Sequence, residues 1–179
     1  MILVTGGNGH LGQWTIAALT ARGYDVVNLS RRPKDHPDIQ GVVWKRPVRT
    51  IACDLSDEES VHRVQEDLSK MEAVIHLAAH IPADTSKNDD ADAEECLKNV
   101  FATIRLLSAL RDAKKMRAFV YASSFEVYGV PKTAPVHEEH PTQPLTYYGA
   151  SKLIGEKYLE IFSRDMHTHY SILRFPAIY

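Results

Sequence analysis

The sequence predicts an α/β protein built on a doubly wound parallel sheet. Six short apolar runs, typical of buried strands, alternate along the 179 residues with segments whose apolar residues recur at helical spacing. A Gly-rich turn, TGGNGHLG (residues 5–12), lies between the first run and the first helical segment. Strands joined by helical crossovers pair in parallel, with helices on both faces. The predicted strands cover residues 1–4, 25–29, 49–53, 73–77, 118–122 and 170–174.

The glycines of the first turn have separate steric roles in dinucleotide binding. Gly6 permits a tight turn, Gly9 lets the backbone approach a pyrophosphate, and Gly12 lets the helix pack closely on the strand. His10 and Leu11 lie at the N-terminus of the helix, where backbone N–H groups attract a phosphate. Because a strand precedes the turn and a helix follows it, the segment is more specific than a Gly triplet alone.

Two long helical stretches and one irregular connection complete the predicted architecture. Residues 31–47 contain three prolines and an apolar VVW run between charged flanks, which indicates an inserted loop or a small hairpin. Residues 90–114 and the stretch that begins near Tyr148 carry apolar residues at helical spacing. One face of each helix must cover the sheet.

A second motif, YGASK (residues 148–152), supplies an acid/base pair. Tyr148 and Lys152 are four residues apart, so they share one face of a helix. The ammonium is expected to favour phenolate and to lower the pKa of Tyr148 toward the range that a general base needs. Tyr147 is the rival, but the residue four positions after it, Ser151, carries no charge.

Composition excludes several other classes of protein. The net charge of −2 gives no electrostatic reason to expect nucleic acid or an acidic membrane surface as a partner. Cys53 and Cys96 are too few for a disulfide framework, and neither HEEH (137–140) nor HTH (167–169) has the His spacing of a helical zinc site. No apolar stretch approaches the length of a membrane span, and Met1 leads directly into the first strand. We expect a cytoplasmic protein without a bound metal.

Seven segments together resemble the extended short-chain dehydrogenase/reductase family, in particular its NAD(P)-dependent nucleotide-sugar epimerase/dehydratase branch. Beside TGGNGHLG and YGASK they are CDLSD, VIHLAAH, KNVFAT, YASSFEVYG and LRFPAIY, in family order. The resemblance implies a Rossmann-type sheet with strand order 3-2-1-4-5-6, and one NAD(P)-binding domain over residues 1–179. The smaller C-terminal substrate domain of the family is absent from this sequence, so we expect either a fragment or a protein that borrows its lid elsewhere.

The end of the second predicted strand bears on the choice of cofactor. NAD enzymes place an acidic side chain there for the ribose hydroxyls, whereas this chain has Ser30, Arg31 and Arg32. An arginine can hold a 2′-phosphate with its planar fork of donors, so we expect NADP to be preferred over NAD. The alternative is that both arginines only solvate the following loop. By resemblance, the other residues at the cofactor are Asp54 and Leu55 near the adenine, Leu77, Ala78 and Ala79 after the fourth strand, Asn99, Phe175, and Tyr148 with Lys152.

The resemblance also implies catalytic roles and an assembly. Ser124 matches the family's catalytic hydroxyl, with Ser123 as the adjacent alternative, and Asn99 matches a position that supports the active-site lysine. Phe125 stands where the dehydratases have an Asp and cannot protonate a leaving hydroxyl, so a sugar 4,6-dehydratase is disfavoured. His76 is expected to be a buried, hydrogen-bonded histidine.

Three functions remain open on the sequence. The first is epimerisation of a nucleotide sugar by transient hydride transfer through Ser124, Tyr148 and Lys152. The second is NADPH-dependent reduction of a ketone or a 4-keto sugar, and the third is a non-catalytic dinucleotide-binding regulator. The family pairs its two long helices into a homodimer, so a homodimer is expected.

Overall fold

The computed structural model describes residues 1–34, 36–84 and 89–176, and within these ranges it contains one six-stranded sheet. All neighbouring strands run parallel, in the order β3-β2-β1-β4-β5-β6. The sequence prediction of a doubly wound sheet in this order is confirmed. The strands are β1 (Ile2–Thr5), β2 (Val26–Ser30), β3 (Arg49–Ala52), β4 (Ala73–His76), β5 (Ala118–Ser124) and β6 (His169–Phe175).

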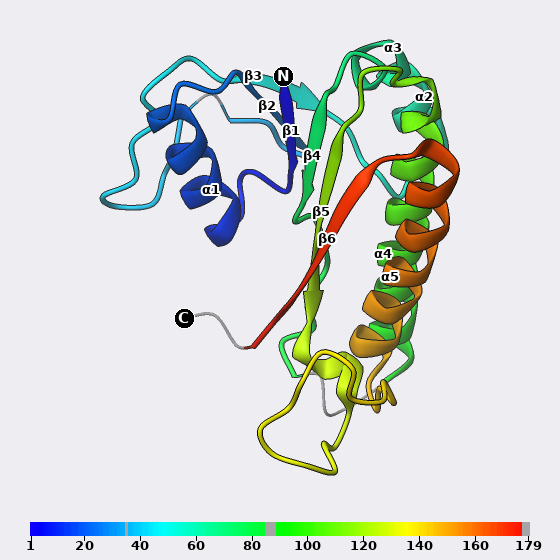
Figure 1. The fold of residues 1–179 in the computed structure, drawn as a ribbon. Helices are drawn as coiled ribbons and strands as arrows, with labels where there is room; N and C mark the ends of the chain where they lie inside the picture. Colours follow the sequence, from blue (N-terminus) through cyan, green and yellow to red (C-terminus); the bar gives the residue numbers. More distant parts are fainter. Residues whose placement is uncertain (35, 85–88, 177–179) are drawn as a thin grey trace.

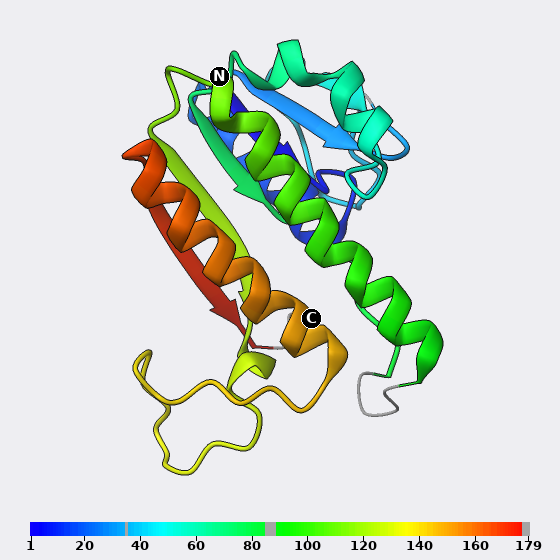
Figure 2. The ribbon, with the colours of Figure 1, turned by 90° about the vertical axis from the view of Figure 1, so that its right-hand side faces the viewer.

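Helices cover both faces of the sheet, but unequally. Helix α1 lies on one face, and the remaining helices lie on the other, where α4 and α5 run side by side (Figures 1 and 2). Within the described ranges, no helix is long and apolar enough to cross a membrane. The helices are α1 (His10–Ala21), α2 (Glu58–Arg63), α3 (Gln65–Leu68), α4 (Asp90–Ala109) and α5 (Tyr147–Met166), with short 3-10 helices η1 (Leu110–Asp112) and η2 (Phe125–Tyr128).

The larger hydrophobic core lies between the sheet and the α4/α5 layer. Phe119 from β5, Leu106 from α4 and Leu159 from α5 are fully buried in it. A smaller core under α1 contains Val4 and Ile16. Complete burial of each such side chain contributes roughly 1.5–3 kcal/mol, so these contacts fix α4 and α5 on the sheet.

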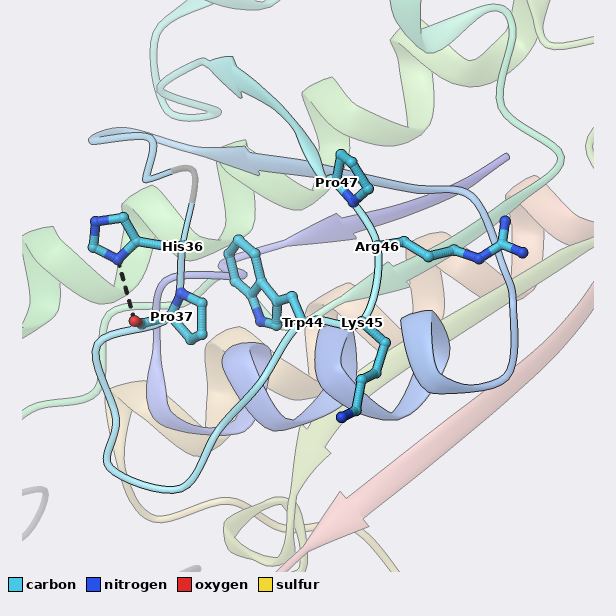
Figure 3. Close-up of a pocket in the computed structure, with 6 residues that line it drawn as sticks. All are labelled: His36, Pro37, Trp44, Lys45, Arg46 and Pro47. Atoms are coloured by element: carbon cyan, nitrogen blue, oxygen red, sulfur yellow. Dashed lines mark hydrogen bonds between the residues drawn. The ribbon is translucent and has the colours of Figure 1, made fainter.

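The described part of the connection between β2 and β3 contains no strand, so it is a loop rather than the small hairpin that was the alternative. Trp44 packs against the smaller core, and its indole N–H donates to the carbonyl of Gln13 over 3.3 Å. The loop encloses an open hollow of about 300 Å³ beside α1 (Figure 3), lined by His36, Pro37, Trp44, Lys45, Arg46 and Pro47. The loop is therefore anchored to α1 at Trp44.

Two strands are longer than the sequence pattern predicted. β5 and β6 pair over seven residues, from Ala118 beside His169 to Ser124 beside Phe175. The sequence pattern ended this strand at Ala122, because the last two residues of β5, Ser123 and Ser124, are polar. A pattern of apolar residues alone cannot locate such a strand end. The last three residues of the LRFPAIY motif lie outside the described residues.

Candidate functional site

A cleft of about 1360 Å³ runs along the carboxyl edge of the sheet, where open α/β sheets bind ligands. It extends from the Gly-rich turn to the N-terminal end of α5. Every residue that the sequence assigned to cofactor or catalysis lines it. They are Gly6, Gly9, His10, Leu11, Gly12, Ser30, Arg31, Arg32, Asp54, Leu55, Leu77, Ala78, Ala79, Asn99, Ser124, Tyr148, Lys152 and Phe175.

The Gly-rich turn has the close contacts that the motif predicts. Gly6 has a φ of +69°, and a Cβ there would lie 2.8 Å from the backbone of Ala78. A Cβ at Gly12 would lie 2.3 Å from the Gly6 carbonyl oxygen. At Gly9 the nearest atom would be 3.3 Å away, so this glycine borders the cleft rather than packed protein. Gly9 thus leaves room for a ligand, whereas Gly6 and Gly12 serve the packing of the turn.

Two residues of the turn were missed by the sequence analysis. A Cβ at Gly7 would lie 2.2 Å from Oδ1 of Asn28, so β2 requires a glycine there too. Asn8 lines the cleft, accepts a 2.8 Å bond from Asn28 and donates its own amide to the carbonyl of Arg32. The polar side chain of Asn8 within the Gly-rich run was the sequence signal that could have indicated its place in the cleft.

The end of β2 contains an unsatisfied polar group. The Ser30 hydroxyl is buried and has no hydrogen-bond partner among the described residues. Arg31 and Arg32 follow it along the cleft wall. A buried hydroxyl without a partner is costly, so its place in the cleft fits a polar ligand such as the ribose or phosphate of a dinucleotide.

Asp54, across from this strand end, accepts two bonds from Ser56, from its N–H at 2.9 Å and its hydroxyl at 2.7 Å. Burial raises the pKa of Asp54, but the bonds from Ser56 outweigh burial and hold the pKa below its usual value. The carboxylate therefore stays charged at the adenine end that the resemblance implies.

A buried histidine fixes the cofactor-facing end of β4. His76 is 1% exposed, and burial, with a smaller contribution from Lys152, lowers its pKa to about 3. Since Thr103 donates its hydroxyl to the carbonyl of Asn99 at 3.0 Å, it accepts the N–H of His76 Nε2 at 3.2 Å. Nδ1 then carries no proton and accepts the hydroxyl of Thr5 at 2.6 Å. The expectation of a buried, hydrogen-bonded histidine is confirmed.

Asn99 holds the loop after β4. Its Oδ1 accepts the N–H of His80 at 2.7 Å, and its Nδ2 donates to the carbonyl of the same residue at 2.9 Å. Both ends of the amide are thus bonded to His80 rather than to Lys152. Asn99 shapes the wall of the cleft, and its expected support of the lysine is not a direct contact.

The N-terminus of α5 is capped from the turn after β5. Thr146 accepts the N–H of Gly149 at 2.9 Å, and its hydroxyl donates to the carboxylate of Glu126. This cap begins the helix immediately before Tyr148. Glu126 therefore supports the start of α5 through Thr146.

Tyr148 and Lys152 meet at the end of the cleft, but the predicted effect on the phenol is wrong. Lys152 Nζ lies 5.7 Å from the centre of the Tyr148 ring and donates to the carbonyl of Ala122 at 2.8 Å. Burial, followed by the negative charge of Glu126, raises the pKa of Tyr148 to about 12. Burial also lowers the pKa of Lys152 to about 8. Desolvation outweighs the charge–phenol attraction because both groups are buried.

The rival residues are distinguished by their surroundings. Tyr147 is 44% exposed at the start of α5, whereas Tyr148 is 8% exposed and lines the cleft. The Ser123 hydroxyl donates to the buried Glu156, whereas within the described ranges Ser124 Oγ only accepts the N–H of Glu126, over 3.2 Å. The Ser124 hydroxyl proton remains available to a substrate oxygen, which favours Ser124 over Ser123.

The comparisons with known proteins agree with this arrangement. Residues 2–179 match the model of the NAD dependent epimerase/dehydratase family. The chain is 32% identical to a putative UDP-glucose 4-epimerase of Methanocaldococcus jannaschii, over all of this chain and 56% of that protein. It is also 32% identical to the UDP-glucose 4-epimerase of Bacillus subtilis, over 93% of this chain and 48% of that protein.

Solved structures show the same similarity. The Bifidobacterium longum UDP-glucose 4-epimerase in complex with NAD+ and UDP aligns with a TM-score of 0.81 and 28% identity, over 97% of this chain and 52% of that one. A short-chain dehydrogenase/reductase superfamily protein from Agrobacterium tumefaciens with bound NAD aligns with a TM-score of 0.80 and 34% identity, over 98% and 48%. This chain spans about half the length of these relatives. It belongs to the NAD dependent epimerase/dehydratase family.

Proposed function

We propose that residues 1–179 form an NAD(P)-binding domain that serves the epimerisation of a nucleotide sugar by transient hydride transfer. The proposal rests on one observation: the residues expected for cofactor binding and for catalysis line the same cleft. Its one end is a Gly-rich turn with room at Gly9, and its other end holds Ser124, Tyr148 and Lys152. Relatives named UDP-glucose 4-epimerase support a uridine nucleotide sugar as the substrate.

Each residue of the catalytic set has a defined task in this proposal. A nicotinamide cofactor supplies the hydride acceptor and later the hydride donor. Ser124 donates its hydroxyl to the substrate oxygen and orients it, and the Tyr148 phenolate takes the hydroxyl proton as the carbon is oxidised to a ketone. Lys152, whose ammonium lies 5.7 Å from the centre of the Tyr148 ring, would hold the nicotinamide ribose. When hydride returns to the opposite face of the ketone, Tyr148 returns the proton.

The Tyr148 phenol requires an additional positive charge for this task. With its pKa at about 12, the phenol is almost fully protonated at neutral pH. An oxidised nicotinamide carries a positive charge, and an opposite charge within about 4–6 Å lowers the pKa of an acid. We infer that binding of the oxidised cofactor converts Tyr148 into an effective base.

We further propose that the domain prefers NADP over NAD. Support comes from the end of β2, where Arg31 and Arg32 line the cleft and Ser30 takes the place of an acidic residue. A guanidinium attracts a 2′-phosphate, and without a carboxylate from β2 that phosphate is not repelled there. Because two solved relatives carry NAD, this preference would distinguish the chain from them.

The arginines also favour one second candidate, reduction of a ketone or 4-keto sugar with NADPH. The catalytic residues would be unchanged, with Tyr148 as the proton donor rather than the base. The two activities differ in net redox change: an epimerase leaves the cofactor in its starting state, whereas a reductase consumes one NADPH for each product.

A homodimer through α4 and α5 is proposed as the assembly. Among the described residues, no other segment covers the outer sides of these helices (Figure 2). Apolar side chains are exposed there, between 41% and 53% each, at Leu97, Phe101, Ile154, Tyr158 and Ile161. The three on α5 are spaced i, i+4 and i+7 and so form one stripe. Such a stripe is typical of a helix that packs against a partner.

Turnover with a nucleotide sugar tests the proposed function. Purified protein is incubated with UDP-glucose and catalytic amounts of NADP or NAD, and the anomeric proton signals are followed by NMR. We expect UDP-galactose to appear without accumulation of reduced cofactor, and the activity to vanish in Tyr148→Phe. Stoichiometric oxidation of NADPH with a keto sugar would instead establish the reductase. Cofactor binding without either reaction would contradict both.

A further inference from the structure

Glu156 is a charged residue inside the protein that the proposed reaction does not use. It lies one helical turn after Lys152 on α5 and is 0% exposed. Its carboxylate accepts the hydroxyl of Ser123 and two bonds from Arg174, from Nε at 3.0 Å and Nη2 at 2.8 Å. A buried carboxylate is tolerated only with such partners, so the three side chains form one unit.

These three side chains connect α5 to β5 and β6 at one position along the strands. Ser123 on β5 and Arg174 on β6 are directly paired in the sheet, and Glu156 bridges them from the helix above. At the same end of the helix, Lys152 donates to the carbonyl of Ala122. The position of α5 over β5 at the cleft is therefore fixed by a lysine bond and by the carboxylate one turn later.

Ser123 lies in the chain between Ala122 and Ser124, which both contribute to the site. The carbonyl of Ala122 receives the Lys152 ammonium, and Ser124 offers its hydroxyl to the cleft. Any displacement of Ser123 along or across β5 must move both neighbours, because they share its peptide bonds. Holding Ser123 from the side therefore holds the acceptor of Lys152 and the hydroxyl of Ser124 together.

Apolar packing of β6 is limited to partly buried side chains, such as Ile172 against the larger core. All seven residues of β6 are exposed or only partly buried. Arg174, in contrast, has further bonds at this level, from Nη1 to the Tyr128 hydroxyl at 2.8 Å and to the Glu138 carbonyl at 3.0 Å. The guanidinium thus joins β6 to α5, to η2 and to the loop before α5.

We propose that Glu156 and Arg174 are positioning residues for the nicotinamide end of the cleft. They set the geometry of Ser124 and Lys152 through Ser123 and touch neither cofactor nor substrate themselves. A buried ion pair adds little net stability compared with an apolar pair of the same size, so its value here is geometric. The inference rests on the proposed function, which assigns Ser124 and Lys152 to that end.

Binding of two ligands separates positioning from folding. In the proposed binding mode NAD would reach both the Gly-rich turn and the catalytic end of the cleft, whereas ADP would reach only the Gly-rich turn and the adenine end. Glu156→Gln keeps the size of the side chain and removes the charge that holds Arg174. We expect it to weaken NAD binding about tenfold, since small misplacements of binding groups have large effects, and to leave the dissociation constant of ADP unchanged. Isothermal titration calorimetry measures both constants.

Glu160→Gln is the matched control, because it removes a carboxylate from the same helix whose partner, Lys157, is solvent-exposed. Its NAD and ADP constants should equal those of the wild type. As a second readout, the Lys152 ¹³Cε resonance, assigned with Lys152→Met, should move in Glu156→Gln and stay in place in Glu160→Gln.

The outcomes are distinct. A Glu156→Gln protein that binds NAD as tightly as the wild type, or loses NAD and ADP affinity equally, overturns the positioning role alone. A folded wild-type protein that binds none of NAD, NADP and ADP overturns the proposed function and this inference with it.

Discussion

Lys152 on α5 donates its buried ammonium to the carbonyl of Ala122 near the end of β5, 2.8 Å away. The lysine is only 3% exposed, and its Nζ also lies 5.1 Å from the centre of the Tyr121 ring. One carbonyl and two aromatic faces replace the water that an ammonium would have on the surface. The fold therefore keeps a costly charge at the place where the proposed reaction needs one.

The burial of Lys152 should make stability depend on pH. Its pKa is about 8 in the folded chain and about 10.5 when unfolded, so between these values the unfolded state binds more protons and stability rises with pH. Between pH 7.5 and 9.5 the titration of Lys152 should raise the free energy of unfolding by roughly 2 kcal/mol. Urea denaturation at both values should show this rise in the wild type relative to Lys152→Met.

The comparison between the two proteins matters because other groups titrate in the same range. Burial raises the pKa of the Cys53 and Cys96 thiols, which opposes the rise in stability, but it does so equally in both proteins. Lys157→Met, at an exposed position of the same helix, should behave as the wild type does. Equal pH dependence in wild type and Lys152→Met would mean that Lys152 is not desolvated.

Cofactor charge should control the ionisation of Tyr148. We expect the phenol to titrate near 12 in the free protein, and oxidised cofactor to lower its pKa by about 1 to 3 pH units. Reduced cofactor has a neutral nicotinamide and should have little effect. The ¹³Cζ resonance of Tyr148, identified by its loss in Tyr148→Phe, reports the titration. Equal shifts with both redox forms would refute the charge effect.

Much of the fold and of the site could be predicted from local sequence. The Gly-rich turn and the alternation of apolar runs determine the sheet, because strand, turn and helix patterns are each local. YGASK places Tyr148 and Lys152 on one helix face by spacing alone. These features need no knowledge of what packs against them.

Other features depend on tertiary contacts and could not be predicted. The pKa of Tyr148 was expected to fall but is raised, since its burial arises from packing of segments far apart in the chain. The sequence favoured Ser124 over Ser123 only through the family resemblance, and the physical difference between them, the bond from Ser123 to Glu156, depends on tertiary packing. That carboxylate and Arg174 are 18 residues apart and share no motif, so only the packing of α5 on β6 brings them together.

The glycines of the turn should separate folding from binding. Gly12→Ala places a Cβ 2.3 Å from the Gly6 carbonyl oxygen, an overlap that should destabilise the fold by about 1–3 kcal/mol. Gly9→Ala meets nothing closer than 3.3 Å and has an ordinary backbone conformation, with φ of −73°. Its stability should be close to wild type, while its methyl group reduces NAD affinity. Thermal denaturation and calorimetric titration measure the two effects. A destabilised Gly9→Ala protein with unchanged NAD affinity would contradict the assignment.

Arg31 should contribute to the affinity for NADP and not to that for NAD. Arg31→Ala removes a guanidinium next to the expected 2′-phosphate, and loss of one charge-assisted contact should weaken NADP binding by about tenfold. The matched control is Arg46→Ala, which lies in the same loop but outside the cleft. Tighter binding of NAD than of NADP by the wild type would disprove the preference itself.

The exposed stripe on α5 should mediate self-association. Ile161 is 53% exposed and lies in line with Ile154 and Tyr158, so Ile161→Glu would bury an unpaired charge in a dimer but not in a monomer. Sedimentation equilibrium should give a dimer for the wild type and a monomer for Ile161→Glu, with unchanged circular dichroism. Val130→Glu introduces the same charge at a residue that is 75% exposed in another part of the molecule, and it should remain dimeric. If the wild type sediments as a monomer at high concentration, the stripe requires another partner; if both variants dissociate, the interface lies elsewhere.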